Sequence, residues 1–362
     1  MHKSILMVFE GLSHGGAERH IVDVAGGIQN LGEHKIIVAT NGGALESELS
    51  DKNVLHEIIP GKRYSPTHLL KAAYAISALV KKHNIDIIHS HSRYYNLVSL
   101  LAIKLFHLAA MRVATVHNVY PDKHWLGFWP SNTICVSTAA EEYVLKHANT
   151  KTRVILNGIP ELHPERNSQD LRQQLGIAPD THILLNIGRL SEQKAQHLLI
   201  EAFFKVINTP DTPPLHLLIA GEGELRQRLE EDIKQFSLDD KISLLGSRDD
   251  IGDLINASDI FVLSSRWEGL GIVLIEAASL GLPLISFKTG GVVEVVHHNK
   301  TGLLVEPEDI TGMSEAIVKL INNPKLRQEM GAAGKELYEK NFTIDKCVYE
   351  TNRFYSDVTK TI

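Results

Sequence analysis

Residues 4–40 read SILMVFEGLSHGGAERHIVDVAGGIQNLGEHKIIVAT and contain the pattern that decides the fold. The apolar runs Ser4–Phe9 and Lys35–Thr40 have the length and composition of buried strands. Between them, apolar residues recur at the three- and four-residue spacing of a helix, and Gly32 follows as a stop signal. These apolar residues are Ile21, Val24, Ala25, Ile28 and Leu31. The stretch therefore predicts a strand–helix–strand unit of a parallel sheet.

The same alternation continues along the chain of 362 residues and is interrupted once. Further β-rich runs are Leu55–Ile59, Ile85–Ser90, Arg112–His117 and Thr133–Val136, then His182–Ile187, Leu215–Ala220, Ile242–Leu245, Ile260–Leu263, Leu284–Ser286 and Leu303–Val305. The stretch Val154–Asp180 is rich in Pro, Asn, Gly and charge, which indicates a connection between domains. Because this length exceeds what one core usually supports, we expect an α/β protein with two parallel-sheet domains.

Composition argues against a disordered protein, a disulfide-stapled protein and a membrane-spanning protein. Hydrophobic residues make up 43% and charged residues 22%, without low-complexity tracts, which is typical of a globular chain. Cys135 and Cys347 lie far apart, so they indicate neither a disulfide framework nor a zinc site and favour a reducing compartment. No signal peptide is evident, and the apolar stretch Val98–Val116 is interrupted by charged residues. We expect a cytoplasmic protein without a membrane span.

Charge is distributed unevenly along the chain. Residues 1–160 contain 16 Lys and Arg against 12 Asp and Glu, a net +4, which leaves 21 against 31, a net −10, for the remainder. Thirteen of the 19 histidines also lie in residues 1–160. Such a basic half could contact anionic lipid, as a peripheral protein on the inner face of a membrane, or a phosphorylated acceptor. A chance imbalance over a solvated surface is the alternative, and no nucleic-acid partner is expected.

Two loops at predicted strand ends carry groups suited to phosphate, at the edge where open parallel sheets bind ligands. Gly15 and Gly16 precede a helix and allow backbone N–H groups to approach an anion, although a tight turn would have the same sequence. In Gly188–Lys194, the planar donor fork of Arg189 and the compact charge of Lys194 could neutralise a diphosphate. Ordinary solvated cations are the alternative for this pair.

The most specific pattern is SSRWEGLGIVLIE at residues 264–276, after a predicted buried strand. Glu268 lies in its glycine-containing loop. Glu276 lies on the following helix among apolar residues, where a carboxylate needs a hydroxyl or cationic partner. Gly269 and Gly271 leave backbone N–H groups open to phosphate near the helix N-terminus. The pattern predicts a phosphate site beside a carboxylate that pairs with a hydroxyl or a cation, with a purely structural role as the alternative.

Together these motifs resemble the retaining glycosyltransferases of family 4, and the resemblance covers nearly the whole chain. The matching elements, in family order, are Gly15–Glu18, Val154–Ile159, Gly188–Lys194, Glu268–Glu276, Gly290–Val296, Thr301–Val305 and Met330–Tyr338. The resemblance implies the GT-B fold, in which two Rossmann-like domains face a central cleft. It implies an acceptor domain over residues 1–160, a nucleotide-sugar domain over 161–342, and a final helix over about 343–362 that packs on the first domain.

The resemblance also implies roles for individual residues. Arg189 and Lys194 would bind the donor diphosphate, Glu268 the transferred sugar, and Glu276 the ribose hydroxyls. Backbone groups of the three glycine-containing loops would meet phosphate and sugar, and His117 would close on the sugar. The backbone residues are Gly15, Gly16, Gly188, Gly269, Leu270, Gly271 and Ile272. No catalytic base is implied, because the leaving diphosphate accepts the acceptor proton. Leu270 stands where the family often has Phe, and Val292-Val293 where it often has Ile-Pro.

Weaker patterns lie in the first half. His89 and His91 could be read as two metal ligands, but no third ligand is evident from the sequence, so we expect no metal and no cofactor. We expect His91 and Arg93 near the acceptor, with packing as the alternative. The segment Pro121–Pro130 contains two tryptophans and could form an acceptor platform, a membrane-dipping lip or a cover over a helix.

The function expected from the resemblance is transfer of a sugar from a nucleoside diphosphate, with UDP preferred to GDP, to a saccharide or lipid-linked saccharide. Biosynthesis of a surface polysaccharide or lipopolysaccharide is the favoured setting. An epimerase of the same fold and a noncatalytic nucleotide-sugar-binding module remain alternatives. An NAD-dependent oxidoreductase is disfavoured, because Gly221-Glu222-Gly223 lacks the third glycine of the dinucleotide fingerprint.

Overall fold

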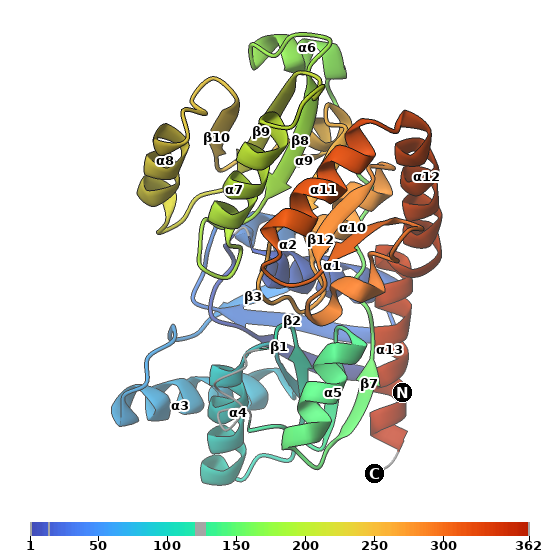
Figure 1. Ribbon diagram of the computed structural model, residues 1–362. Coiled ribbons are helices and arrows are strands. Elements are labelled where there is room, and N and C mark those ends of the chain that lie inside the picture. The colour runs from blue at the N-terminus through green and yellow to red at the C-terminus, as the bar shows by residue number, and fades with distance from the viewer. Residues whose placement is uncertain (1, 14, 120–127, 361–362) are drawn as a thin grey trace. The chain divides into compact units, whose positions relative to one another are not determined.

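The computed structural model describes residues 2–13, 15–119 and 128–360 and contains two compact units. Unit 1 comprises Met1–Pro160 with Phe342–Ile362, and unit 2 comprises Glu161–Asn341. Each unit is a parallel sheet with helices on both faces (Figure 1). No helix in the described part of the chain is both long enough and apolar enough to cross a bilayer.

Unit 1 contains a seven-stranded sheet in the order β3-β2-β1-β4-β5-β6-β7. The strands are β1 (Lys3–Val8), β2 (His34–Thr40), β3 (Leu55–Ile58), β4 (Ile87–Ser90), β5 (Met111–Val116), β6 (Asn132–Cys135) and β7 (Lys151–Val154). The helices are α1 (Gly16–Leu31), α2 (Glu46–Asp51), α3 (Pro66–His83), α4 (Arg93–Phe106), α5 (Thr138–His147) and α13 (Ile344–Lys360). Every neighbouring pair of strands is parallel, as the alternation predicted.

Local sequence signals explain where these helices begin and end. Helix α1 ends at Gly32, which adopts a left-handed φ of 68°. Helix α3 begins with Pro66 after Ser65, whose side chain accepts a hydrogen bond from the His68 backbone N–H. Asn84, with φ of 50°, ends the same helix. The ends of these helices are therefore determined by residues close to them in the sequence.

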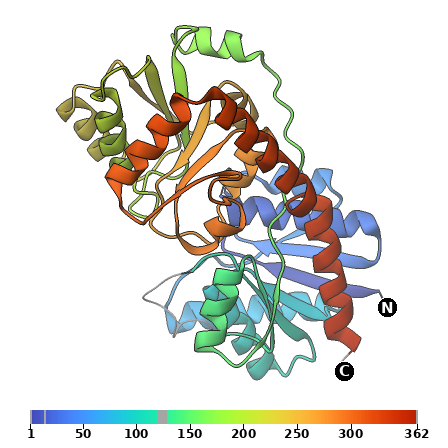
Figure 2. The same cartoon turned by 45° about the vertical axis from the view of Figure 1, so that its right-hand side comes forward.

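Helix α13 belongs to unit 1 although it follows the whole of unit 2 in the chain (Figure 2). It packs on α1, and Val348 and Tyr355 enter the core that contains Ile21 and Ile28. The approach is close at Gly27, where an added Cβ would lie 2.3 Å from Val348 Cγ2. The apolar side of α13 is thus buried in unit 1.

Unit 2 contains a six-stranded parallel sheet in the order β10-β9-β8-β11-β12-β13. The strands are β8 (His182–Ile187), β9 (Leu215–Ala220), β10 (Ile242–Gly246), β11 (Ile260–Leu263), β12 (Leu284–Phe287) and β13 (Gly302–Val305). The helices are α6 (Ser168–Gln174), α7 (Gln196–Ile207), α8 (Arg226–Gln235), α9 (Ile251–Asn256), α10 (Ile272–Ser279), the 3-10 turn η2 (Gly290–Glu294), α11 (Ile310–Ile321) and α12 (Pro324–Asn341).

Strand order reverses once in each sheet, and open parallel sheets commonly bind ligands at such a point. In unit 1, β1 lies between β2 and β4, and in unit 2, β8 lies between β9 and β11. At such switch points the loops after adjacent strands diverge and leave a crevice at the carboxyl edge. The predicted site loops follow β1 and β4 in unit 1 and β8 and β11 in unit 2.

The predicted fold class is confirmed, with two local differences. The sequence did not predict β7, which has only one apolar residue, Val154, because it is an edge strand and its exposed side needs none. Helix α6 lies within the stretch Val154–Asp180, which was expected to be a connection. Asn167 caps α6 by accepting from the Gln169 N–H at 2.8 Å, so the polar composition reflects a short capped helix.

Candidate active site

The unit 2 site is built on the loops after β8 and β11. The first loop, Gly188–Ala195, leads into α7, and the side chain of Lys194 lies over Gly188, where an added Cβ would be 3.3 Å from Lys194 Cε. Arg189 is exposed and makes no ion pair with any residue that the structure describes. The loop therefore offers one cation held close to the backbone and one open to a ligand.

Lys194 and Glu268 are brought together from the two loops. Lys194 Nζ lies 2.5 Å from Glu268 Oε1, and Ser265 Oγ donates to the same oxygen at 2.7 Å. Glu268 is only 6% exposed, so its carboxylate is buried with a cation and a hydroxyl as partners. This pairing satisfies a charge that would otherwise be unfavourable away from water.

Hydrogen bonds to backbone carbonyls tie the two loops to each other. Gln193 Nε2 donates to the Trp267 carbonyl at 2.9 Å, and the Arg266 N–H donates to the Gln193 carbonyl at 2.8 Å. Ser264 Oγ donates to the Lys194 carbonyl at 2.9 Å. The sequence did not single out Gln193, Ser264 or Ser265, although all three lie inside the quoted motifs. These bonds hold the Lys194–Glu268 pair in place.

Arg266 and Arg189 have different surroundings despite lying on neighbouring loops. Arg266 pairs with Glu192 at 2.7 Å and with Glu308 at 2.8 Å. Its charge is thus compensated within the protein. Arg189 lacks such partners among the described residues, which leaves it available to an anion.

The start of α10 is open to an anion. Gly271 precedes the helix with a left-handed φ of 85°, and none of the described side chains caps the first turn that Ile272 begins. The preceding residues Gly269 and Leu270 are buried beneath it. Glu276 lies one turn further along α10 and is half-buried. Uncapped N–H groups at a helix N-terminus suit a phosphate.

The glycines Gly290 and Gly291 lie directly against the backbone of the Glu268 loop. Gly290 has a left-handed φ of 48°, and an added Cβ there would lie 1.9 Å from the Glu268 carbonyl oxygen. The Gly291 N–H points to that same carbonyl at 3.4 Å. Gly290 is therefore needed because the η2 turn approaches the Glu268 backbone closely.

The unit 1 site is a cluster of two buried histidines and one half-buried histidine at the switch point. His91 follows β4 and His117 follows β5, and His91 Nδ1 lies 3.0 Å from His117 Nε2. His20, on α1, places its ring 5.0 Å from that of His117, edge to face. The sequence did not single out His20, because within a helical pattern nothing distinguishes it from a packing residue.

Burial keeps these imidazoles neutral. It lowers the pKa of His20 to about 4, and it lowers the pKa of His91 and that of His117 well below the ordinary value of 6.5. Among the residues that the structure describes, one ring nitrogen of each has no hydrogen-bond partner: His20 Nδ1, His91 Nε2 and His117 Nδ1. A neutral imidazole with a spare nitrogen is suited to a sugar hydroxyl.

The sequence made no third ligand evident beside His91, whereas the structure places two further histidines there. One ring nitrogen each of His20, His91 and His117 lies within 4.8 Å of the other two, an arrangement that a metal ion could also use. The alternative in which His89 is a metal ligand, disfavoured from the sequence, does not fit the hydrogen bonds of its ring. Its Nδ1 forms a hydrogen bond with Tyr355 Oη at 2.5 Å, and its Nε2 forms one with Thr115 Oγ1 at 2.7 Å. Both ring nitrogens are therefore engaged within unit 1.

The remaining unit 1 residues lie at helix starts. Gly15 is the N-cap of α1 and Gly16 its first residue, so backbone N–H groups are presented after β1. Arg93 begins α4, and its guanidinium donates to Tyr143 Oη at 2.8 Å. In the predicted aromatic segment, Pro121–Gly127 lies outside the described residues, whereas the Phe128 carbonyl accepts from Arg112 at 2.6 Å.

Comparison with known proteins decides the family. Residues 167–337 match the family described as glycosyl transferases group 1, and residues 14–161 match the family described as glycosyltransferase family 4. The chain belongs to the family 4 glycosyltransferases. The two matches together cover most of both units, and the loops after β8 and β11 lie inside the first.

Named relatives of this glycosyltransferase cover most of its length. It is 26% identical to the N-acetyl-α-D-glucosaminyl L-malate synthase of Bacillus anthracis, over 90% of each chain. It is 28% identical to the UDP-Gal:α-D-GlcNAc-diphosphoundecaprenol α-1,3-galactosyltransferase of Escherichia coli, over 80% of each. The crystal structure of a glycosyltransferase from Rickettsia africae superposes with a TM-score of 0.84 at 25% identity, over 99% of each chain. The predicted GT-B fold is thereby confirmed.

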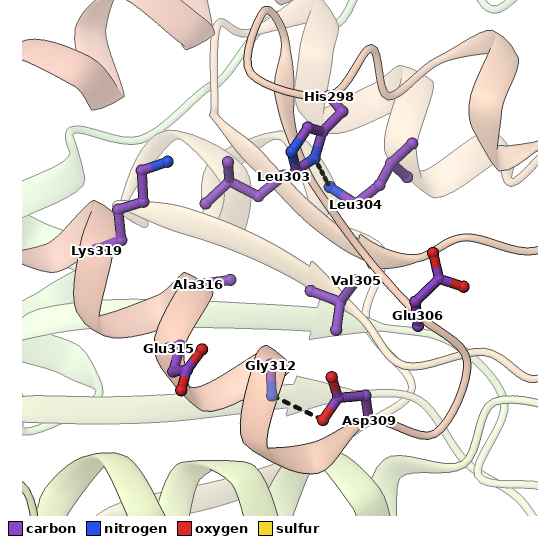
Figure 3. Close-up of a pocket in the computed structure, with 10 residues that line it drawn as sticks. All are labelled: His298, Leu303, Leu304, Val305, Glu306, Asp309, Gly312, Glu315, Ala316 and Lys319. Carbon is purple, nitrogen blue, oxygen red and sulfur yellow. Dashed lines mark hydrogen bonds between the residues drawn. The ribbon is translucent and has the colours of Figure 1, made fainter.

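A separate cavity of this glycosyltransferase lies between β13 and α11 at the edge of the unit 2 sheet (Figure 3). Its volume is 310 Å³, and its rim carries Glu306, Asp309 and Glu315. Asp309 accepts from the Gly312 N–H at 2.9 Å and so serves as a helix cap. None of the predicted site residues lines this cavity, and its carboxylates would repel a diphosphate.

Proposed function

We propose that this glycosyltransferase moves a sugar from a UDP-sugar to a saccharide acceptor with retention of anomeric configuration, in the synthesis of a surface polysaccharide or lipopolysaccharide. The observation that carries the proposal is the Lys194–Glu268 pair at the unit 2 switch point. Beside it lie Arg189, which forms no ion pair with a described residue, and the start of α10, which no described side chain caps. Cations, a buried carboxylate and free N–H groups are the chemistry that a diphosphate linked to a sugar requires.

The donor residues follow from this chemistry. Arg189 and Lys194 bind the diphosphate and stabilise the negative charge that grows as it leaves. The Glu268 carboxylate, held by Lys194 and Ser265, accepts hydrogen bonds from sugar hydroxyls. Glu276 binds the ribose hydroxyls, and the N–H groups near Gly271 and Ile272 contact phosphate. Gly188 and Gly269 allow the close approach that these contacts need.

The acceptor end of the reaction is proposed for unit 1 residues. His117 hydrogen-bonds the transferred sugar, while His91 and Arg93 contact the acceptor, and Gly15 and Gly16 offer N–H groups to the diphosphate. In the reaction, the bond from the anomeric carbon to the diphosphate oxygen breaks and a bond to the acceptor oxygen forms on the same face. The acceptor proton passes to the departing diphosphate, so no side chain has to act as a base.

Two relatives have names that state a donor: one matches 80% of this chain and is named for a UDP-sugar, and the other matches 48% and is named for GDP-mannose. The longer match supports UDP. The Escherichia coli relative uses UDP-galactose and acts on a sugar linked through diphosphate to a polyprenol, and it matches 80% of this chain. We therefore propose UDP-sugar as the donor class and a saccharide, free or lipid-linked, as the acceptor class.

The experiment supplies UDP-sugars and saccharide acceptors to the purified protein and follows UDP release together with the anomeric proton coupling of the product by NMR. An α-linked product from an α-configured donor is the expected result. An inverted linkage would contradict retention. An altered sugar nucleotide formed without acceptor would indicate an epimerase, and donor binding without turnover would indicate a noncatalytic module.

A further inference from the structure

Helices α3 and α4 of unit 1 form a surface that exposes large apolar side chains. Tyr74 is 64% exposed, Leu70 is 51% exposed and Leu105 is 49% exposed. We call this surface the α3–α4 face, and its residues are Tyr64, Leu70, Lys71, Tyr74, Lys104 and Leu105. Such side chains, gathered on one surface, indicate a site of interaction.

Helical spacing places the exposed residues of α3 on one side. Leu70 and Tyr74 are four residues apart, and Lys71 and Lys81 lie beside them on the outer side, while Ala72, Ala73, Ile76 and Val80 face the core. The opposite side of α3 is therefore already buried, and nothing in unit 1 covers the outer side among the described residues.

Two ring contacts join the helices into one continuous surface. The rings of Tyr74 and Phe106 are 5.9 Å apart, and those of Tyr64 and Tyr94 are 5.4 Å apart. Figure 1 shows α3 and α4 side by side, in agreement with their packing. The face therefore extends from Tyr64, two residues before α3, to the last turn of α4.

The charge of this region is strongly positive. Residues 61–112 contain eight Lys and Arg but one acidic residue, Asp86, which pairs with Lys3. Some of the cations are compensated, because Lys62 pairs with Glu10 and Lys82 pairs with Glu57. Lys71, Lys81 and Lys104 make no ion pair with any residue that the structure describes.

We propose that the α3–α4 face binds the surface of an anionic phospholipid bilayer. Lysines attract the headgroups, while leucine and tyrosine side chains enter the boundary between headgroups and acyl chains. A second copy of the chain fits this surface poorly, because a twofold interface would place lysines against lysines. An anionic bilayer complements both the charge and the apolar character.

The face reaches the end of unit 1 that carries the proposed acceptor residues. Helix α4 begins at Arg93, two residues after His91, and Tyr64 contacts Tyr94 in the first turn of that helix. The helix spans about 20 Å to its last turn, where Lys104 and Leu105 lie. This step rests on the proposed function, because it would let a lipid-linked acceptor reach His91 and Arg93 from the same bilayer.

The experiment measures flotation of the full chain with vesicles of 40% phosphatidylglycerol in phosphatidylcholine and with vesicles of phosphatidylcholine alone. No nucleotide sugar is present, so the result does not depend on sugar transfer. We expect binding to the anionic vesicles, little binding to the neutral ones, and release when salt is raised from 0.1 to 0.5 M. Equal binding to both vesicles, or none to either, would overturn the proposal.

Matched double variants locate the contact. Leu70→Ser with Lys71→Ser removes an exposed leucine and its neighbouring lysine from the face, and we expect vesicle affinity to fall at least fivefold. Leu145→Ser with Lys146→Ser removes an equivalent exposed pair from α5 and should leave affinity unchanged. Equal losses in both variants would contradict the assignment. A second result would also contradict the assignment: the wild type is a dimer in sedimentation equilibrium and only the Leu70 and Lys71 variant is a monomer. A second copy of the chain would then occupy the face.

Discussion

Lys194 Nζ and Glu268 Oε1 lie 2.5 Å apart although the two residues are separated by 74 positions in the chain. They meet because β8 and β11 are neighbours in the unit 2 sheet, which brings the loops after these strands to one edge. Ser265 holds the same carboxylate oxygen, so the pair is already ordered without ligand. This order reduces the rearrangement required when a donor binds.

Replacement of Arg189 by alanine should depress turnover much more than donor binding. The guanidinium is uncompensated by described residues, and removal of one preorganised donor to a developing charge typically lowers kcat about 100- to 1,000-fold. Steady-state kinetics with UDP release as the signal would measure this. Arg228→Ala is the control, because Arg228 is exposed and pairs with Glu192. Near-normal kcat in the Arg189 variant would contradict its role.

Replacement of Gly290 by alanine should disturb the Glu268 loop. Its Cβ would lie 1.9 Å from the Glu268 carbonyl oxygen, so the loop must move. Gly32→Ala is a matched control, because Gly32 also has a left-handed φ but nothing within 4 Å of an added Cβ. We expect Gly290→Ala to weaken donor binding at least tenfold and Gly32→Ala to cost only about 1 kcal/mol of stability. Equal donor affinities in the two variants would count against the proposed site.

Acidification should destabilise the protein through its buried histidines. Burial lowers the pKa of His20 to about 4 and that of His89 to about 3, whereas the unfolded value is about 6.5. The unfolded chain therefore binds protons first as pH falls below 6.5, and each histidine should remove about 2 kcal/mol of stability between pH 7 and pH 5. Urea unfolding at both pH values would measure the loss.

His20→Phe provides the comparison for this pH dependence. Without the imidazole, one source of proton uptake disappears, so the difference in unfolding free energy between pH 7 and pH 5 should shrink by about 2 kcal/mol. An unchanged difference would show that His20 does not stay neutral when the chain is folded.

Chelation should leave sugar transfer unchanged, because the proposed reaction uses protein cations on the diphosphate. Activity after dialysis against EDTA, compared with activity before it, is the measurement. If EDTA removed the activity and Zn²⁺ restored it in the wild type but not in His20→Ala, the result would instead show that His20, His91 and His117 hold a required metal.

Sequence alone predicted both parallel sheets and the loops that carry the unit 2 site, because strand periodicity and glycine punctuation are local signals. It placed Lys194 and Glu268 separately, on diphosphate and on sugar, and did not predict that they pair. Their contact depends on which strands are neighbours, and periodicity does not encode strand order.

The histidine cluster was harder to predict for the same reason. His20 lies 71 residues before His91 and belongs to a helix whose pattern predicts packing. It reaches His91 and His117 because α1 follows β1, and β1 lies beside β4 in the sheet. Gly290 likewise acquires its role only through a backbone contact with Glu268.

The most direct test of the central claim is calorimetric titration of UDP-sugars into the wild-type protein and into Lys194→Met, without metal or acceptor. The account predicts selective binding of a UDP-sugar by the wild type and at least tenfold weaker binding by the variant, because the diphosphate loses a cation and Glu268 loses its partner. No binding of any UDP-sugar by the wild type, or equal affinity in the two proteins, would contradict it.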